Sequence, residues 1–311
     1  MIFSENFLES VQKNFDAATA FYFKDELTAK IPGYLETIYA ELNGFKLVPV
    51  KKSAMPGQQF VSYLTYDTYG RPEYITDLAT DMPSVSANAV EKHFQIYTKA
   101  LSMQYSKMDQ IMGQLTSRSY IEQLAKAILR GFAQDTNNCI FFGDRLVPGW
   151  INNPNLSSSV VSNGASGSPL WASKTPDEIV EDLNDAITKV LDDSNNSHKV
   201  TTIAISLDKY RYMQTTRLGT GLQATILEQF YYCNPGVNVI AANEINKKFT
   251  GGADGFIAYV NNGDNFWYEM GDMKATDLHN KTSLAYEIGY LKSHGGVQII
   301  TPKSQIIKFG I

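Results

Sequence analysis

Residues 139–156 read CIFFGDRLVPGWINNPNL and lie in mid-chain, directly after a long helical pattern. Here an apolar run ends in Gly-Asp, a Pro-Gly-Trp turn follows, and a loop of Asn and Pro completes the stretch. Glycine and proline force special backbone conformations, and asparagine side chains hydrogen-bond to nearby backbone groups. The segment has the features of a site, and its meaning depends on what the rest of the chain contains.

The overall composition indicates a folded protein that does not bind nucleic acid tightly. The chain has 311 residues, of which 43% are hydrophobic, enough for a sizeable core or two subdomains. It carries 27 basic and 32 acidic residues and a net charge of −5. Binding through phosphates needs clustered Lys and Arg, so this composition argues against tight nucleic-acid binding. If the chain lies near DNA, it is expected to wall the DNA off rather than bind it.

The cysteines and the termini favour a cytosolic product. Cys139 and Cys233 lie far apart with no CxxC spacing, which predicts reduced, buried thiols. The N-terminus lacks a basic start followed by an apolar run, so no signal peptide is expected. The longest uncharged stretch, residues 146–173, is rich in Asn, Ser and Gly and is predicted to be a loop and not a membrane span.

Residues 1–44 have the pattern of an arm. Two short amphipathic segments flank a middle broken by Pro32-Gly33. The apolar residues form no dense pattern of their own, so the arm is expected to lie on another surface. That surface is either the core of the same chain or another molecule.

Residues 45–108 alternate in the manner of strands. The segments FKLVPVKK and QQFVSYLTYDTYG lead to a turn region, and KHFQIYTKALSMQYSK returns. The pattern predicts a long two-stranded hairpin with excursions. Because an isolated two-stranded ribbon is marginal in water, it should lie on a neighbour. An ordinary sheet inside a β-rich domain is the alternative.

Residues 109–136 predict one long helix that ends near residues 135–138. Ile121, Leu124, Ile128 and Phe132 recur with helical spacing, and Ala125 and Leu129 widen the apolar stripe.

Residues 165–293 predict a compact α/β subdomain. Thr175-Pro176-Asp177-Glu178 is a strong helix start, with a capping Thr and a Glu three residues later. The buried face of this helix is predicted to consist of Ile179, Leu183, Ile187 and Val190. Strands are predicted at 200–207, 237–241, 255–260 and 265–270, and short helices at 209–214 and 223–232. The pattern of residues 283–311 predicts a strand, a turn at His294-Gly295-Gly296, a second strand and a terminal strand that is paired into a sheet.

No catalytic, cofactor-binding or metal-binding residues are predicted. His93, His198, His279 and His294 show no metal-ligand spacing, and no serine lies in a GxSxG elbow. Gly219-Thr220-Gly221 opens a helix without a P-loop Lys, and the Asp192–Asn196 region lacks EF-hand spacing. The function is therefore expected to reside in contacts, and the chain is not expected to be an enzyme.

The order of these parts resembles a known family. A hairpin, a long helix, Phe142-Gly143-Asp144 leading to Gly149-Trp150-Ile151-Asn152-Asn153-Pro154, an α/β lobe and a terminal Gly-Ile follow one another. This sequence is similar to the major capsid proteins of tailed bacteriophages, whose Hong Kong 97-like α+β fold is shared by encapsulins. Trp150 and Ile151 stand where leucines are common in that family.

The resemblance implies a domain plan. Residues 1–44 would be the N-terminal arm and 45–108 the extended hairpin, or E-loop, that lies over a neighbouring subunit. Residues 109–164 and 286–311 would form the peripheral domain, with 109–136 as its spine helix. Residues 165–285 would form the axial domain, and the 139–156 loop would join the two domains and act through its shape.

The resemblance also implies a function. Copies of the chain would form hexamers and pentamers of an icosahedral shell around double-stranded DNA, assembled in the bacterial cytoplasm and found in the virion. A separate scaffolding protein, a portal and decoration proteins are the expected partners; no membrane partner and no cofactor are expected. A Lys–Asn cross-link, known in some members, would have Lys51 or Lys52 as candidates, but no partner is identifiable.

Three alternatives remain open at this point. An encapsulin-type compartment would need a groove for cargo peptides, which the sequence does not show. A soluble α/β enzyme would be a small oligomer with a polar pocket. A tail or other virion protein would form tubes or rings.

Overall fold

The computed structural model describes residues 41–55, 57–72, 74, 84–116, 120–219, 223–282 and 284–311. The chain divides into two units, Met1–Glu41 and Leu42–Ile311, and all the described helices and strands belong to the second. The predicted arm, 1–44, therefore lies almost wholly outside the described residues. No helix among the described residues is both long and apolar enough to cross a membrane.

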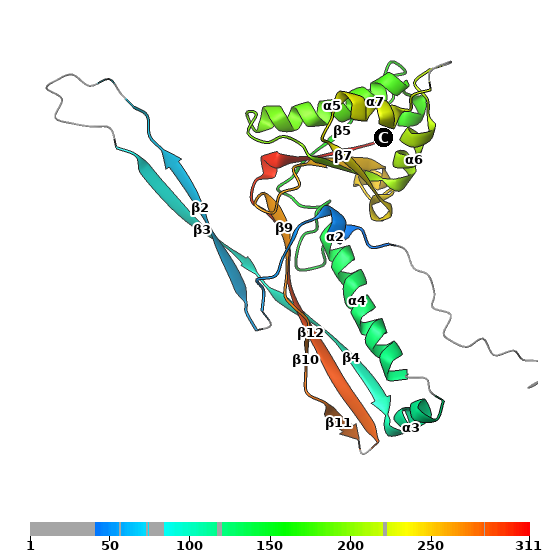
Figure 1. Cartoon of the computed structure of the whole chain (residues 1–311). Coiled ribbons are helices and arrows are strands. Elements are labelled where there is room, and N and C mark those ends of the chain that lie inside the picture. The colour runs from blue at the N-terminus through cyan, green and yellow to red at the C-terminus, as the bar shows by residue number, and fades with distance from the viewer. Residues whose placement is uncertain are drawn as a thin grey trace, which may run out of the picture. The chain divides into compact units, whose positions relative to one another are not determined.

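A five-stranded sheet forms the centre of an α/β lobe (Figure 1). In spatial order its strands are β5 (Ser157–Val160), β13 (Gln305–Phe309), β8 (Gly255–Tyr259), β6 (Thr202–Ser206) and β7 (Asn238–Ala242). The β5–β13 and β6–β7 pairs at the two edges are parallel. The β13–β8 and β8–β6 pairs in the middle are antiparallel. The sequence predicted β6, β7 and β8 within two residues, and the expected pairing of the terminal strand is confirmed by β13.

Three helices cover this sheet. They are α5 (Pro176–Asp193), α6 (Leu207–Thr215) and α7 (Ile226–Cys233). The predicted start of α5 is confirmed, because the Thr175 side chain accepts from the Glu178 N–H while the Glu178 carboxylate accepts from the Thr175 N–H. Ile179 and Leu183 of the predicted face are fully buried in the lobe core.

A second sheet is organised around one long strand, β12 (Ala285–Ile299). Its first part pairs antiparallel with β4 (Tyr97–Ser106), and its last part pairs antiparallel with β9 (Phe266–Met270). The remaining strands are β1 (Val50–Lys51), β10 (Lys274–Ala275) and β11 (His279–Thr282).

The predicted turn at residues 294–296 is wrong. The strand β12 runs through these residues, and the pairing register shifts between His294 and Gly296. Gly296 has a positive φ of 73°. A single left-handed glycine of this kind makes a bulge that bends a strand without reversing it.

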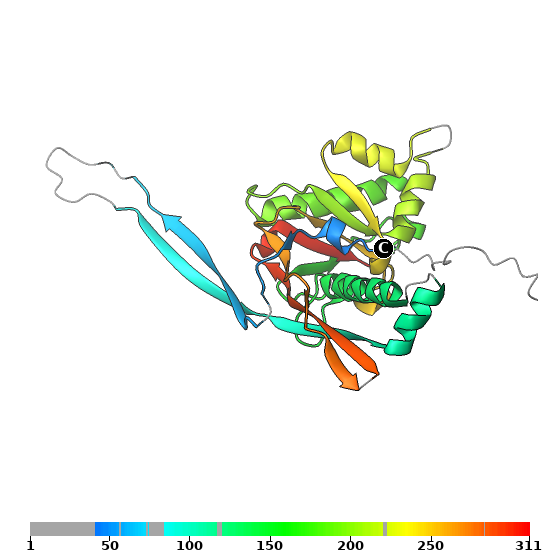
Figure 2. The same ribbon diagram turned by 60° about the horizontal axis from the view of Figure 1, so that its bottom comes forward.

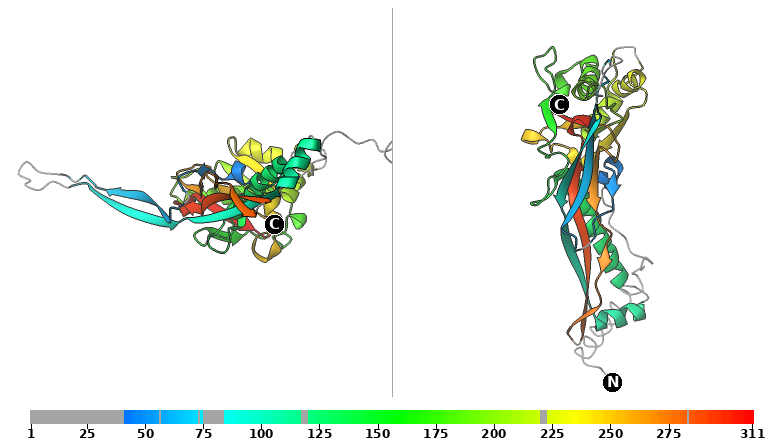
Figure 3. Two further views of the ribbon diagram at one scale, coloured as in Figure 1. Left: turned by 90° about the horizontal axis from the view of Figure 1, so that it is seen from below. Right: turned by 90° about the vertical axis from the view of Figure 1, so that its left-hand side faces the viewer.

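The helical stretch is also divided differently from the prediction. Two helices, α3 (Lys107–Thr116) and α4 (Tyr120–Phe142), replace the single helix 109–136, and residues 117–119 lie outside the described residues. α4 runs along the β4–β12 pair (Figures 1 and 3), where Ile128 and Phe132 pack against Met103. Leu129, predicted to widen the buried stripe, is 57% exposed.

The predicted hairpin is present but shorter than expected. β2 (Phe60–Tyr69) and β3 (Ser86–Gln95) pair antiparallel along their whole lengths. After the buried Ile96, the returning segment leaves β2 and continues as β4 in the second sheet. Figures 1 and 2 both show the β2–β3 ribbon running away from the two sheets. Before it, the segment predicted to be extended begins with the helical turn α2 (Gly44–Leu47).

Candidate functional site

The stretch 143–156 folds back onto the end of α4. The last four carbonyls of a helix have no partner within it. Here each one receives a donor: the N–H of Gly143 bonds to the Cys139 carbonyl at 3.0 Å, and the Asn152 side-chain amide bonds to the Phe142 carbonyl at 2.8 Å. The two carbonyls between them accept from the N–H groups of Trp150 and Ile151, at 2.8 and 3.0 Å. The loop therefore closes the helix.

Gly143 and Asp144 shape the turn that makes this return. Gly143 has a φ of 68°, and a Cβ at this position would collide with the Val147 carbonyl oxygen. The Asp144 Oδ1 accepts from the N–H groups of Leu146 and Val147, at 2.8 and 3.2 Å. These bonds fix one carboxylate oxygen and leave Oδ2 free to face other groups.

Trp150 is a core residue that joins the loop to both sheets. Its side chain is fully buried. Its ring stacks on Phe266 of β9 at a centroid distance of 5.6 Å and meets Tyr259 of β8 edge-on at 4.8 Å. The indole N–H donates to Gln305 Oε1 of β13 at 2.8 Å. This part of the opening stretch therefore fixes the position of α4 relative to the two sheets.

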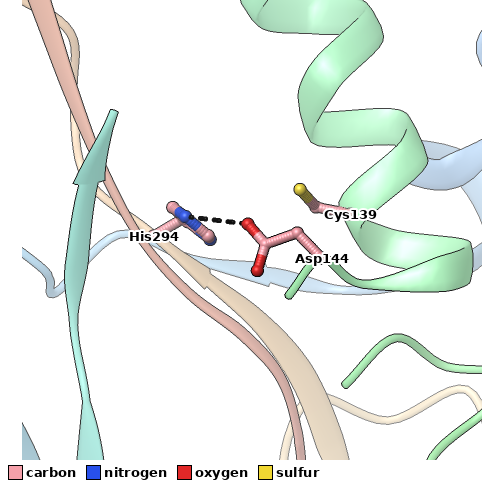
Figure 4. Close-up of side chains that lie close together, drawn as sticks. All are labelled: Cys139, Asp144 and His294. Atoms are coloured by element: carbon pink, nitrogen blue, oxygen red, sulfur yellow. Dashed lines mark ion pairs between the residues drawn. The ribbon is translucent and has the colours of Figure 1, made fainter. Parts of the chain in front are cut away.

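A polar cluster lies beside this junction (Figure 4). Cys139 at the end of α4, Asp144 after it and His294 at the β12 bulge place one ligand atom each within 4.8 Å of one another. In the described part of the chain, no other group of three or more His, Cys, Asp or Glu side chains lies close enough to hold a metal ion. Spacing rules missed this group, because His294 is remote from the other two in sequence.

Lys99 of β4 supplies the positive charge in the cluster. Its ammonium donates to both Asp135 carboxylate oxygens at 2.9 Å and to the Cys139 sulfur at 3.1 Å, and it pairs with Asp144 Oδ2 at 3.0 Å. Burial acts against the charged form, but these acceptors outweigh it and raise the pKa of Lys99. Lys99 is therefore charged at neutral pH.

The other members of the cluster have pKa shifts that fit this charge. Burial tends to raise the pKa of Asp144, but the Leu146 N–H and the Lys99 ammonium outweigh it and lower that pKa. Burial, and then the positive charge of Lys99, lower the pKa of His294. Burial raises the pKa of the Cys139 thiol, against the hydrogen bond from Lys99. At neutral pH Asp144 is ionised, while His294 and Cys139 are neutral.

The remaining residues considered from sequence are dispersed. His93 on β3 and His279 on β11 are exposed, and His198 lies in the turn after α5. Asn195 and Asn196 adopt positive φ in that turn, while Gly219-Thr220-Gly221 falls largely outside the described residues.

The two lysines considered for cross-linking have partners within the chain. The Lys51 ammonium lies 3.8 Å from the centre of the Trp267 ring. The Lys52 ammonium lies 2.8 Å from a carboxylate oxygen of Asp272. Both lysines precede the β2–β3 ribbon.

The β2–β3 ribbon carries large apolar side chains in the open. Phe60, Leu64 and Tyr66 share one face and are 58%, 55% and 70% exposed. On the other face, Tyr63 contacts the Trp267 ring at 5.9 Å, near the base of the ribbon. Such a row of uncovered apolar side chains is typical of a contact surface.

Solved structures share this fold at low sequence identity. The capsid of Myoviridae phage XM1 matches with a TM-score of 0.75 and 13% identity, over 92% of this chain and 98% of that chain. A Microbacterium phage Oxtober96 structure matches with a TM-score of 0.61 and 10% identity, over 91% and 94%. The capsid of an empty GTA particle matches with a TM-score of 0.62 and 10% identity, over 93% and 97%.

Sequence comparisons give a second, independent result. No curated protein matches the chain significantly. The family model described as "Major capsid protein" matches residues 70–310, from the ribbon to the end of the terminal strand. The fold and this match agree with the Hong Kong 97-like resemblance found in the sequence, and the chain belongs to the major capsid protein family.

Proposed function

We propose that copies of this chain assemble as hexamers and pentamers into the closed icosahedral shell that encloses the double-stranded DNA of a tailed phage. Family membership and the likeness to phage and GTA capsids support this role and do not favour an encapsulin-type compartment. The net charge of −5 suits a container that contacts its DNA weakly and without sequence preference.

The exposed ribbon is the observation that carries the proposal. Full burial of one large apolar side chain stabilises by about 1.5–3 kcal/mol. Phe60, Leu64 and Tyr66 leave most of that contribution unrealised in the single chain. A neighbouring copy is the occupant that a shell supplies, and head-to-tail contacts of this kind close into rings.

The domain plan is part of the proposal. Residues 45–108 act as the E-loop, of which β2 and β3 are the projecting part. Residues 109–164 and 286–311 act as the peripheral domain, 165–285 as the axial domain, and 1–44 as the N-terminal arm. The connection of β4 to β12 supports this plan, since it attaches the base of the ribbon to the strand on which α4 lies.

The partners and the location follow from the same role. A scaffolding protein guides shell curvature, a portal occupies one vertex, and decoration proteins bind the finished surface. The shell forms in the bacterial cytoplasm and ends in the virion.

Electron microscopy of the protein expressed alone and with its scaffolding protein, with sedimentation alongside, tests the proposal. Closed shells or rings of five and six subunits are expected. Particles that stay small and never assemble under either condition would contradict it. Tubes would favour a tail protein.

A ribbon variant tests the E-loop assignment directly. Replacing both Leu64 and Tyr66 by serine, or deleting residues 67–73, should leave a folded subunit that cannot build stable shells. Asn88→Ser on the same ribbon is the matched control and should assemble normally, because it changes an exposed polar side chain. Normal shells from the Leu64/Tyr66 variant would refute the assignment.

A further inference from the structure

His294 is a buried polar group without a hydrogen-bond partner. The residue is 4% exposed, and neither ring nitrogen has a partner among the described residues. Its Nε2 lies 3.6 Å from Asp144 Oδ2, which is too long for a hydrogen bond. Leaving such a group unpaired costs about 1–3 kcal/mol. Shell assembly does not explain why an unpaired histidine is buried here, so the groups around the ring are considered next.

The surroundings are a set of metal ligands. Figure 4 shows the His294 ring directed at the Asp144 carboxylate, with the Cys139 sulfur beside it. Because two backbone N–H groups hold Asp144 Oδ1, the other oxygen is presented to the ring as an ordered ligand. Thiolate, imidazole and carboxylate together are the ligands that Zn²⁺ takes in tetrahedral sites.

The distances permit this coordination after a small closure. The three ligand atoms lie within 4.8 Å of one another. Metal–ligand bonds of about 2.0–2.3 Å at tetrahedral angles bring ligand atoms to about 3.5 Å apart. These three ligand atoms must therefore move closer together by about 1 Å, which side-chain rotations of Cys139 and His294 can supply. Asp135 is not one of the three, although its Oδ2 lies 3.9 Å from the Cys139 sulfur, so a water molecule takes the fourth position of a tetrahedral site.

Lys99 already marks the place of a cation. Its ammonium lies 3.0 Å from Asp144 and 3.1 Å from Cys139, two of the three ligands, and 2.9 Å from the neighbouring Asp135. The Lys99 side chain is 30% exposed, so the ammonium can turn outward to solvent. Lys292 also acts on the ring electrostatically, and its ammonium donates to Thr136 Oγ1 at 2.9 Å.

We propose that Cys139, Asp144 and His294, with a water molecule in the fourth position, bind a transition-metal dication of the Zn²⁺ class, and that Lys99 occupies the metal position in the metal-free chain. Binding displaces the Lys99 ammonium and releases the Cys139 thiol proton to solvent, so the thiolate becomes a ligand. The metal joins the end of α4, the loop that closes it and the bulge of β12. Metal binding at this site does not require an assembled shell.

Cobalt titration of the full chain tests the site. After chelator treatment under reducing conditions, Co²⁺ should bind at one equivalent with tetrahedral visible bands and a sulfur-to-cobalt charge-transfer band. Cys139→Ser should abolish the charge-transfer band. Cys233→Ser is the matched control, because Cys233 is the exposed second cysteine, and it should keep the band. A wild-type chain without the band, or a Cys139→Ser chain that keeps it, would overturn the proposal.

Two further variants keep the test decisive if Cys139→Ser does not fold. Lys99→Met removes the competing ammonium and should tighten Co²⁺ binding by about tenfold or more, equivalent to 1.4 kcal/mol. Asp144→Asn, at a side chain that is 24% exposed, should weaken Co²⁺ binding by a similar factor while circular dichroism stays unchanged. Unchanged affinity in both variants would remove Lys99 and Asp144 from the site and refute the proposal.

Discussion

Replacing Trp150 by alanine should strongly destabilise the unassembled subunit. The side chain is fully buried and contacts aromatic rings from three elements, so its removal leaves a cavity that costs about 3–5 kcal/mol. Gln305 Oε1 also loses its donor inside the core, which adds about 1–3 kcal/mol. At about 2 °C per kcal/mol or more, even the cavity alone lowers the melting temperature by at least about 6 °C.

Differential scanning fluorimetry of matched variants separates the two contributions. Trp150→Phe keeps a ring in the core but not the indole N–H, so it should cost only about 1–3 kcal/mol. Tyr232→Ala, at a side chain that is 85% exposed, should change stability by about 0.5 kcal/mol or less. A Trp150→Ala subunit that melts within about 2 °C of the wild type would refute the core role of this residue.

Three further changes test local features by thermal unfolding of the subunit. Gly143→Ala should cost more than the matched Gly167→Ala: both positions have positive φ, worth about 1–2 kcal/mol, but only at Gly143 does the new Cβ meet the Val147 carbonyl. Equal losses would contradict the close approach at Gly143. Lys174→Met should cost about 3–5 kcal/mol, because it leaves the buried Asp182 carboxylate without its ammonium at 2.6 Å. Adding Asp182→Asn should recover part of that loss, and no recovery would argue against an unpaired charge as the cause. The Ala165 and Thr175 N–H groups lower the pKa of Glu178, so its contribution is present above pH of about 4.3 and is lost as the pH falls through the lower folded-state pKa. Glu178→Gln should therefore flatten the acid side of the stability profile, and an unchanged acid slope would count against this role.

The α/β lobe could be predicted from sequence because local signals and burial agree there. The Thr175 capping box starts α5, and the apolar run that contains β6 is buried along its length. Such signals act over a few residues, so they can be recognised in one sequence without knowledge of the tertiary structure.

The predictions failed where tertiary pairing decides the structure. A His-Gly-Gly sequence suits a turn or a bulge equally, and only the pairing of β12 with β4 and β9 selects the bulge. The return segment of the hairpin has a uniform strand pattern, so nothing local indicates that it changes partners at Ile96. β-pairing depends on context more than helix formation does.

The polar cluster could not be predicted for a related reason. Cys139 and Asp144 are close in sequence, and the closure of α4 by the following loop places them together. His294 joins them only because β12 passes beside the end of α4, and no spacing rule covers that separation. The exposed aromatic side chains of β2 were visible in the sequence, but alternation alone does not tell which face another chain covers.

The bulge in β12 is a pivot point, and the part of the strand from Ala285 to His294 is the arm that turns about it. From Ala285 to His294 the strand keeps one continuous ladder with β4, and at about 3.4 Å per residue this arm is about 30 Å long. A rotation of about 10° at Gly296 would therefore move the far end of the arm by about 5 Å, since strand rise fixes its length. β4 continues through Ile96 into β3, so the same rotation reaches the ribbon. One glycine torsion thus couples the direction of the ribbon to the angle between the β4-paired and β9-paired parts of the second sheet.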